Sequence, residues 1–182
     1  FVSLGGAIPP YRSDLMLKVV KSLINLGLNV SIDFINKSDH KHILINARKI
    51  GFPENCLNIY SLDHNLISHH LNNFDFGLIF YDSSKWRRVC SPTKLGEFLS
   101  AGLPIICLEG VDIVDELNKK YNFILSLSKY AFSKNLIGYS VSQFVKMSFN
   151  NKSCQILAKD EFSITIANKM YSEIYKNILF NE

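Results

Sequence analysis

The chain has 182 residues, of which 47% are hydrophobic and 20% charged, a size and balance sufficient for one packed core. Its net charge of +4 comes from scattered basic residues, which argues against a dedicated nucleic-acid surface. No apolar run approaches the roughly 20 residues that span a bilayer. The opening residues do not resemble a signal peptide, so we expect a cytoplasmic protein without a transmembrane segment.

Six apolar or β-branched runs are predicted as strands, and segments of helical period separate them. The predicted strands cover residues 1–4, 30–35, 57–60, 76–80, 105–108 and 123–125. This alternation is typical of βαβ units around a parallel sheet. We therefore expect one α/β domain over residues 1–182. Because the sequence opens on a strand without an initiator Met, we also expect it to be a fragment of a longer protein.

Helices are predicted between and after these strands. In the first, apolar residues recur at helical spacing, Ser13 and Asp14 are expected to cap the start, and Gly27 to close the end. Further helices are predicted over residues 38–50, 64–71, 91–102, 142–149 and 164–178. The four cysteines lie far apart without a C-x-x-C pair, so we expect them to be reduced and mostly buried.

The segment from residue 91 to residue 104 is the most informative part of the chain. Ser91 suits a helix N-cap, Pro92 the first helical position, and Gly102 a left-handed helix end. The first amides of such a helix have no intrahelical acceptors and lie at the positive end of its dipole. They predict a phosphate or diphosphate site, to which Thr93 and Lys94 can add side-chain donors.

Glu97 lies four residues after Thr93, on the same helix face and about 6 Å further along the axis. That distance is roughly the step from phosphate to ribose. A carboxylate only accepts hydrogen bonds, so it suits the two hydroxyls of a ribose. The alternative interpretation is an ordinary amphipathic helix, with Leu95, Phe98 and Leu99 facing inward and Glu97 solvated.

The string SPTKLGEFLSAGLPII, residues 91–106, resembles the donor-site segment of GT-B fold glycosyltransferases, particularly the retaining group called group 1. The resemblance extends over the chain through the opening strand and glycine turn, NIYSL, FDFGLIF and a terminal helix ending near Tyr175. It implies a Rossmann-like, nucleotide-sugar-binding domain that forms the C-terminal half of such an enzyme. The acceptor-binding N-terminal domain would lie outside this sequence.

The resemblance also implies roles for particular residues. Glu97 would bind the donor ribose. The loop after the third strand would contact the base, although a plain loop is an equal alternative there: Ser61, Leu62 and Asp63. The turn after the first strand can let the backbone approach phosphate, although tight turns use Gly pairs routinely. The expected diphosphate-binding residues are Gly5, Gly6, Arg12, Ser91, Thr93, Lys94 and Leu95.

Some positions depart from the family pattern. Val89 stands where many members have a Glu that contacts the transferred sugar. Gly6 and Tyr11 stand where many have an Arg and a Lys that neutralise phosphate charge. Other cations can substitute, although Arg87 and Arg88 are equally well explained as surface charges: Arg12, Arg87, Arg88 and Lys94. Residues after the fourth strand can face the sugar: Asp82, Ser83 and Ser84. We identify no catalytic residue.

These features predict an enzyme in its full-length form, a glycosyltransferase whose isolated donor domain is inactive. Expected partners are a nucleotide sugar, the chain's own N-terminal domain and an acceptor glycan or lipid-linked sugar, in surface polysaccharide or glycolipid synthesis. Nucleic acid is not an expected partner. The full-length protein would be cytoplasmic, with the inner face of the membrane as an alternative location.

We expect no cofactor and no metal. The five histidines include an H-x-H and an H-H pair but have no carboxylate or Cys at ligand spacing. Two alternatives to the transferase remain open. One is a nucleotide-sugar epimerase on the same two-domain fold, and the other is a non-catalytic α/β regulatory or interaction domain.

Overall fold

A six-stranded parallel sheet forms the centre of the computed structural model, which describes residues 1–82, 93–134 and 136–180. The strand order is β3-β2-β1-β4-β5-β6. The strands are β1 (Val2–Leu4), β2 (Ile32–Ile35), β3 (Leu57–Tyr60), β4 (Gly77–Ile79), β5 (Ile105–Leu108) and β6 (Ile124–Leu127). All six predicted strands and the α/β fold class are confirmed, with small differences at the strand ends.

The strand order reverses between β1 and β4. β1 pairs in parallel with β2 on one side and with β4 on the other, so the chain leaves β1 and β4 toward different halves of the sheet. In open α/β sheets, ligands bind outside the carboxyl ends of the strands at such a switch point. This geometry selects the turn after β1 and the segment after β4 as the place to look for a site.

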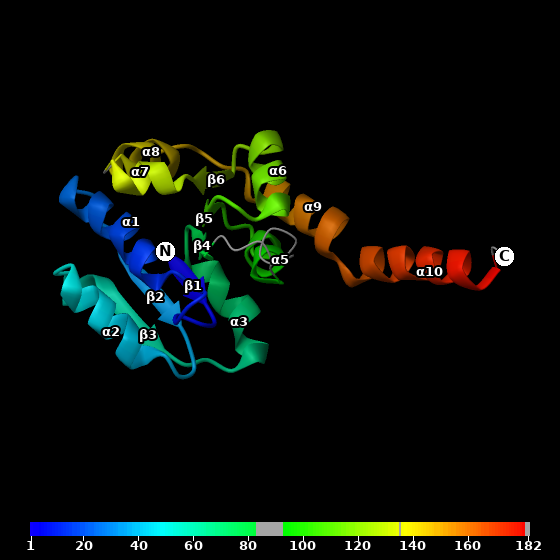
Figure 1. The fold of residues 1–182 in the computed structure, drawn as a ribbon, viewed down its shortest axis with the longest axis horizontal. Coiled ribbons are helices and arrows are strands. Elements are labelled where there is room, and N and C mark those ends of the chain that lie inside the picture. The colour runs from blue at the N-terminus through cyan, green and yellow to red at the C-terminus, as the bar shows by residue number, and fades with distance from the viewer. Residues whose placement is uncertain (83–92, 135, 181–182) are drawn as a thin grey trace.

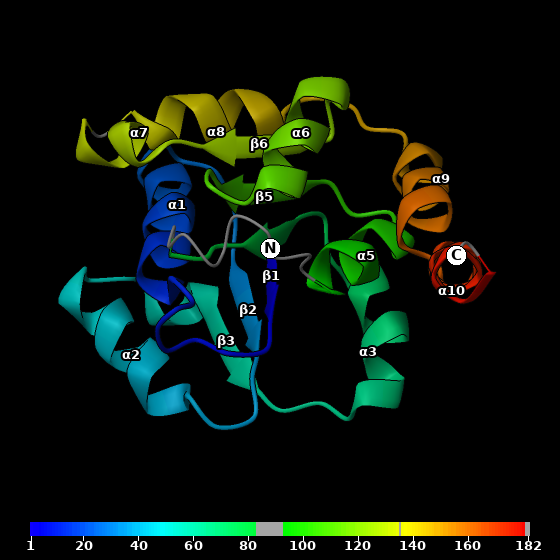
Figure 2. The ribbon, with the colours of Figure 1, turned by 45° about the vertical axis from the view of Figure 1, so that its right-hand side comes forward.

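Helices cover both faces of the sheet (Figures 1 and 2). One face is covered by α1 (Ser13–Asn25), α2 (His40–Lys49), α7 (Lys129–Ser133) and α8 (Ile137–Val145). The other is covered by α3 (His64–His70), α5 (Thr93–Ser100), α6 (Asp112–Lys120) and α9 (Asn151–Phe162). Two short 3-10 turns, Glu54–Cys56 and Leu71–Asn73, adjoin β3 and α3.

Two hydrophobic cores lie between the sheet and these layers because successive strand side chains point to opposite faces. Phe34 packs in the core under α1 and α2, whereas Ile35 packs under α3 and α5. Gly77 of β4 lies directly beneath the fully buried Phe98 of α5, and a Cβ at Gly77 would lie 2.6 Å from the Phe98 ring. Because Gly77 has no side chain, α5 packs closely against the sheet at this position.

Most helix predictions are confirmed, and the positive φ of Gly27 and Gly102 after α1 and α5 agrees with their predicted role as helix ends. Helices α6, α7 and α9 were not predicted, and α8 spans Ile137–Val145, earlier in the chain than the helix predicted over residues 142–149. The predicted cap of α1 is wrong. Arg12 occupies the N-cap position without a side-chain cap, because the Ser13 hydroxyl donates to the Ala7 carbonyl oxygen and Asp14 binds Arg12.

The last helix, α10 (Ile164–Phe180), projects from the body of the molecule and ends far from the sheet (Figure 1). None of the helices in the described ranges is both long and apolar enough to cross a membrane. Cys107 and Cys154 are buried and Cys56 is half-buried, all three as free thiols, while Cys90 lies outside the described residues.

Candidate functional site

The segments that follow β1 and β4 are joined at the switch point. The Arg12 amide donates to the Phe80 carbonyl oxygen at 3.1 Å, and the Asp82 amide donates to that of Pro10 at 2.8 Å. Tyr11 and Tyr81 form an antiparallel bridge between these contacts. The turn after β1 therefore has a fixed position relative to residues 80–82, which directly follow β4.

The turn after β1 needs both of its glycines. Gly5 has a φ of +79°, a conformation that other residues adopt only with strain, and a Cβ there would lie 2.8 Å from Cε of Lys94. A Cβ at Gly6 would lie 2.3 Å from the Tyr11 ring. Turn geometry and close packing thus explain the presence of both glycines, in agreement with the interpretation of this segment as a tight turn. Their contact with phosphate stays a prediction.

Lys94 reaches this turn from the first turn of α5. Its Nζ lies 4.7 Å from the centre of the Tyr11 ring, and its aliphatic stem lies against Gly5. An ammonium over an aromatic face is held by the negative charge of the ring face. The contact brings a positive charge to the turn that the sequence analysis assigned to the diphosphate.

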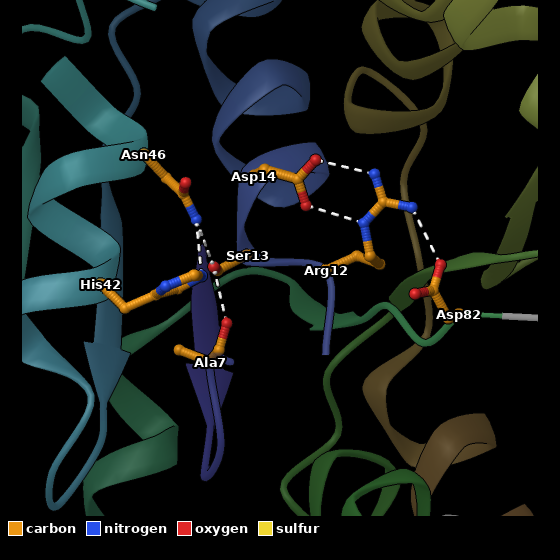
Figure 3. A network of polar contacts seen from close by, with 7 residues as sticks. All are labelled: Ala7, Arg12, Ser13, Asp14, His42, Asn46 and Asp82. Atoms are coloured by element: carbon orange, nitrogen blue, oxygen red, sulfur yellow. Dashed lines mark hydrogen bonds and ion pairs between the residues drawn. The ribbon is translucent and has the colours of Figure 1, made fainter. Parts of the chain in front are cut away.

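Arg12 lies beside the same turn, but its charge is offset by two carboxylates (Figure 3). Its Nε and one terminal nitrogen donate to both oxygens of Asp14 at 2.8 and 2.7 Å, and its other terminal nitrogen donates to Asp82 at 2.9 Å. Burial by itself raises the pKa of Asp14, but the hydrogen bonds and charge of Arg12 outweigh it and lower that pKa below its ordinary value. Arg12 therefore holds Asp82 in place.

Glu97 and Thr93 face a large cavity of about 1090 Å³. Glu97 is half-buried and Thr93 is exposed, while the Leu95 side chain is fully buried, so only the Leu95 amide could meet a ligand. The cavity is bounded by α3, α5, the end of α9 and α10 as far as Ile174. Its other walls include His64, Ile67, Ser68, Leu71, Phe162, Met170, Tyr171 and Ile174.

A second cavity, of about 250 Å³, lies between the turn after β1 and the loop after β3. Gly5, Gly6 and Leu62 line it, together with Asn36 and Ile67. Ile67 also lines the large cavity, so the two adjoin along the carboxyl edge of the sheet.

The predicted base loop lines a third cavity next to the second. Ser61, Leu62 and Asp63 all line it, and Leu62 belongs to both. The Ser61 hydroxyl donates to the Asn36 carbonyl oxygen at 3.1 Å, which ties this loop to the one after β2. The three cavities thus run from the base loop past the glycine turn to Glu97.

Asn36 and Asp39, which follow β2 and contact the glycine turn, were not among the predicted site residues. Polar residues directly after a strand that ends at the same sheet edge were the signal that could have found them. Several predicted residues lie outside the described ranges: Ser83, Ser84, Arg87, Arg88, Val89 and Ser91. Among the described residues, no group of three or more His, Cys, Asp or Glu side chains could hold a metal ion.

These observations define a Rossmann-like α/β fold with a chain of cavities at its topological switch point. No family model and no curated protein matches the sequence. Solved structures do match over 100% of this chain. One is WaaG, a glycosyltransferase involved in lipopolysaccharide biosynthesis, with 14% sequence identity and a TM-score of 0.69. Another is a glycosyltransferase from Rickettsia africae ESF-5, with 14% identity and a TM-score of 0.66.

The chain spans about half of both solved structures, 47% and 48% of their lengths. At such low identity the likeness concerns the fold. The chain has the Rossmann-like fold of one half of a GT-B glycosyltransferase, as its resemblance to that family implied.

Proposed function

We propose that this chain is the donor-binding domain of a glycosyltransferase. It would bind a nucleoside-diphosphate sugar for transfer to an acceptor glycan or lipid-linked sugar, in surface polysaccharide or glycolipid synthesis. One observation carries the proposal: α5 presents Glu97 to a cavity and Lys94 to the glycine turn, beside the switch point of a glycosyltransferase-like fold.

The diphosphate is assigned to the space between the glycine turn and the start of α5. Lys94 supplies a cation there, and the first amides of α5 supply donors at the positive end of the helix dipole. Thr93 adds an exposed hydroxyl, and Ser91 remains a proposed donor. When the sugar is transferred, negative charge builds up on the leaving diphosphate. Preorganised donors of this kind would stabilise it, without a metal.

The nucleoside is assigned to the neighbouring cavities. Glu97 would accept hydrogen bonds from the ribose hydroxyls, one helical turn beyond Thr93. The base would lie at Ser61, Leu62 and Asp63, which line the cavity next to the glycine turn. Arg12 is assigned a supporting role here, because its guanidinium is already bound by Asp14 and Asp82.

The apolar face of α10 is proposed to pack on the other domain of the full-length enzyme. Met170, Tyr171 and Ile174 are 58%, 61% and 49% exposed, and all three line the cavity that Glu97 faces. A large apolar surface left open to water is unfavourable and usually marks an interface. A domain seated on α10 would stand beside the donor site, where an acceptor has to approach. The isolated chain would then bind its donor without turnover.

The test is a calorimetric titration of the chain with UDP, GDP and ADP. Saturable binding of one of them supports the proposal and identifies the base. Glu97→Ala should weaken that binding about 10- to 100-fold, the loss expected for charge-assisted hydrogen bonds. Glu116→Ala is the matched control, because Glu116 is an exposed helical Glu of α6 that lines none of the three cavities. Failure to bind any of the three diphosphates would favour the interaction-domain alternative.

A further inference from the structure

The glycine turn after β1 is held from outside by the loop that follows β2. The Asn36 side-chain amide donates to the Gly5 carbonyl oxygen at 2.6 Å, and the Ala7 amide donates to Oδ2 of Asp39 at 2.8 Å. The carbonyl oxygen of Ala7 accepts from the Ser13 hydroxyl at 2.8 Å (Figure 3). Both polar groups of the Ala7 backbone are thus bound by side chains, one from the nearby start of α1 and one from the loop after β2.

Asn36 and Asp39 form a unit of their own. Asn36 is only 3% exposed, its side-chain oxygen accepts from the amides of Ser38 and Asp39, and its side-chain nitrogen lies 3.3 Å from Oδ2 of Asp39. The Ser38 hydroxyl donates to the other carboxylate oxygen at 3.1 Å. The hydrogen bond from the Ala7 amide is the largest of the effects that lower the pKa of Asp39, so the carboxylate is ionised at neutral pH.

These contacts leave one amide of the turn available. The Gly5 amide donates to the Ile35 carbonyl oxygen and the Ala7 amide to Asp39, whereas the Gly6 amide donates no hydrogen bond within the described part of the chain. Gly6 lines the 250 Å³ cavity, and the stem of Lys94 lies against its neighbour Gly5. The Gly6 amide and the Lys94 ammonium, which reaches the turn from α5, are therefore two donors beside the same short turn.

The carboxylate of Asp39 is unexpected beside a site proposed to bind phosphate. Asp39 lines the same cavity as Gly6, and its negative charge repels any phosphate that binds nearby. By charge alone, a neutral residue would suit an anion site better. The hydrogen bond that Asp39 accepts from the Ala7 amide explains its presence, because this bond fixes the backbone next to Gly6.

Resting on the function proposed above, we propose that Asp39 is a positioning residue for the donor diphosphate, which holds the turn so that the Gly6 amide and Lys94 meet the same phosphate. The role depends on the side-chain oxygen as a hydrogen-bond acceptor. The negative charge of Asp39 has no favourable part in it. These two properties can be separated by substitution.

The experiment compares Asp39→Ala with Asp39→Asn in the same titration with UDP, GDP and ADP. Asn keeps an oxygen that can accept from the Ala7 amide, and its nitrogen can donate to the Ser38 hydroxyl. Asp39→Ala should weaken diphosphate binding about tenfold, because the hydrogen bond that orders the turn is lost. Asp39→Asn should bind as tightly as the native chain or more tightly. If Asp39→Ala does not fold, Asp39→Ser replaces it with the same expectation, because the Ser hydroxyl ends short of the Ala7 amide.

Asn150→Ala is the matched control for stability. Asn150 also accepts a hydrogen bond from a backbone amide, that of Lys152, but it caps α9. Its neighbour Asn151 lines a cavity with Phe1 and Asp75, at the amino edge of the sheet. The control variant should lose thermal stability and keep the native dissociation constant.

Two results would overturn the inference while the proposed function stands. They are a folded Asp39→Ala chain with native affinity, or an Asp39→Asn chain as weak as Asp39→Ala, provided in both cases that Glu97→Ala weakens binding. A native chain that binds none of the three diphosphates would refute the proposed function and the inference with it.

Discussion

Lys94 of α5 and Tyr11, which follows the glycine turn, are in direct contact, with Nζ 4.7 Å from the centre of the ring. In the sequence comparison with GT-B glycosyltransferases, Gly6 and Tyr11 align with positions where many members of that family have cations. Here a positive charge reaches the same turn from a different element. The Tyr11 ring fills the space against Gly6 and supports the Lys94 ammonium above it.

Replacing Lys94 with Ala should weaken diphosphate binding about 10- to 100-fold, because a charge-assisted contact to phosphate is lost. Calorimetry with the preferred nucleoside diphosphate measures the change. Lys49→Ala, at the exposed end of α2, removes the same charge away from the turn and should have little effect. Equal affinities for the Lys94→Ala and native chains would mean that the phosphate lies elsewhere.

Replacing Arg12 with Ala should reduce the free energy of unfolding by about 1 kcal/mol, since a partly buried bidentate pair with Asp14 is broken. Binding of the diphosphate should weaken less than in Lys94→Ala, because Asp14 and Asp82 already offset the Arg12 charge. Urea titrations and calorimetry on both variants check this order. The reverse order would make Arg12 the principal cation of the site.

The stability of the chain should fall in acid partly through Asp14. Its folded-state pKa lies below the ordinary value, so its contribution is complete above the unfolded-state pKa and is lost as the pH falls through the folded-state pKa. Urea titrations from pH 6 down to about pH 3 should show this loss, and Asp14→Asn should flatten it. An equally steep decline in the variant would assign the acid sensitivity to other carboxylates.

Replacing Gly77 with Ala should reduce the free energy of unfolding by about 1–3 kcal/mol, the usual effect of overpacking a core. The added Cβ would lie 2.6 Å from the ring of Phe98, which is fully buried and has no room to retreat. Because α5 rests on this contact, the shift should also weaken nucleotide binding. Gly27→Ala is a useful contrast, since nothing lies within 4 Å of a Cβ there and any loss comes from its φ of +81° alone.

Much of the fold was predictable because it depends on local patterns. The six strands are short apolar runs, and α1 carries a continuous apolar face. The helices that were missed have few buried residues. In α6 only Val114 and Leu117 are buried, and α9 buries Cys154, Leu157 and Ala158 within a largely polar sequence.

The candidate site also contains residues that a local sequence pattern predicts and contacts that it does not. Glu97 and Lys94 were predicted as site residues because one helix, with start and stop signals in its sequence, carries both and resembles the donor-site segment of GT-B glycosyltransferases. The contacts of Arg12 with Asp82 and of Ala7 with Asp39 join segments that are far apart in the sequence. They depend on the strand order, which places β2 and β4 on either side of β1, and no local pattern specifies that order.

The most direct test of the account is a cycle that combines Glu97→Ala with a change in the ligand. The native chain and the variant are each titrated with the preferred nucleoside diphosphate and with its 2′-deoxy and 3′-deoxy forms. If Glu97 binds the ribose, removing a hydroxyl should weaken binding to the native chain and change binding to the variant very little. If the deoxy ligands lose the same affinity on both chains, Glu97 does not contact the ribose and the proposed donor site is wrong.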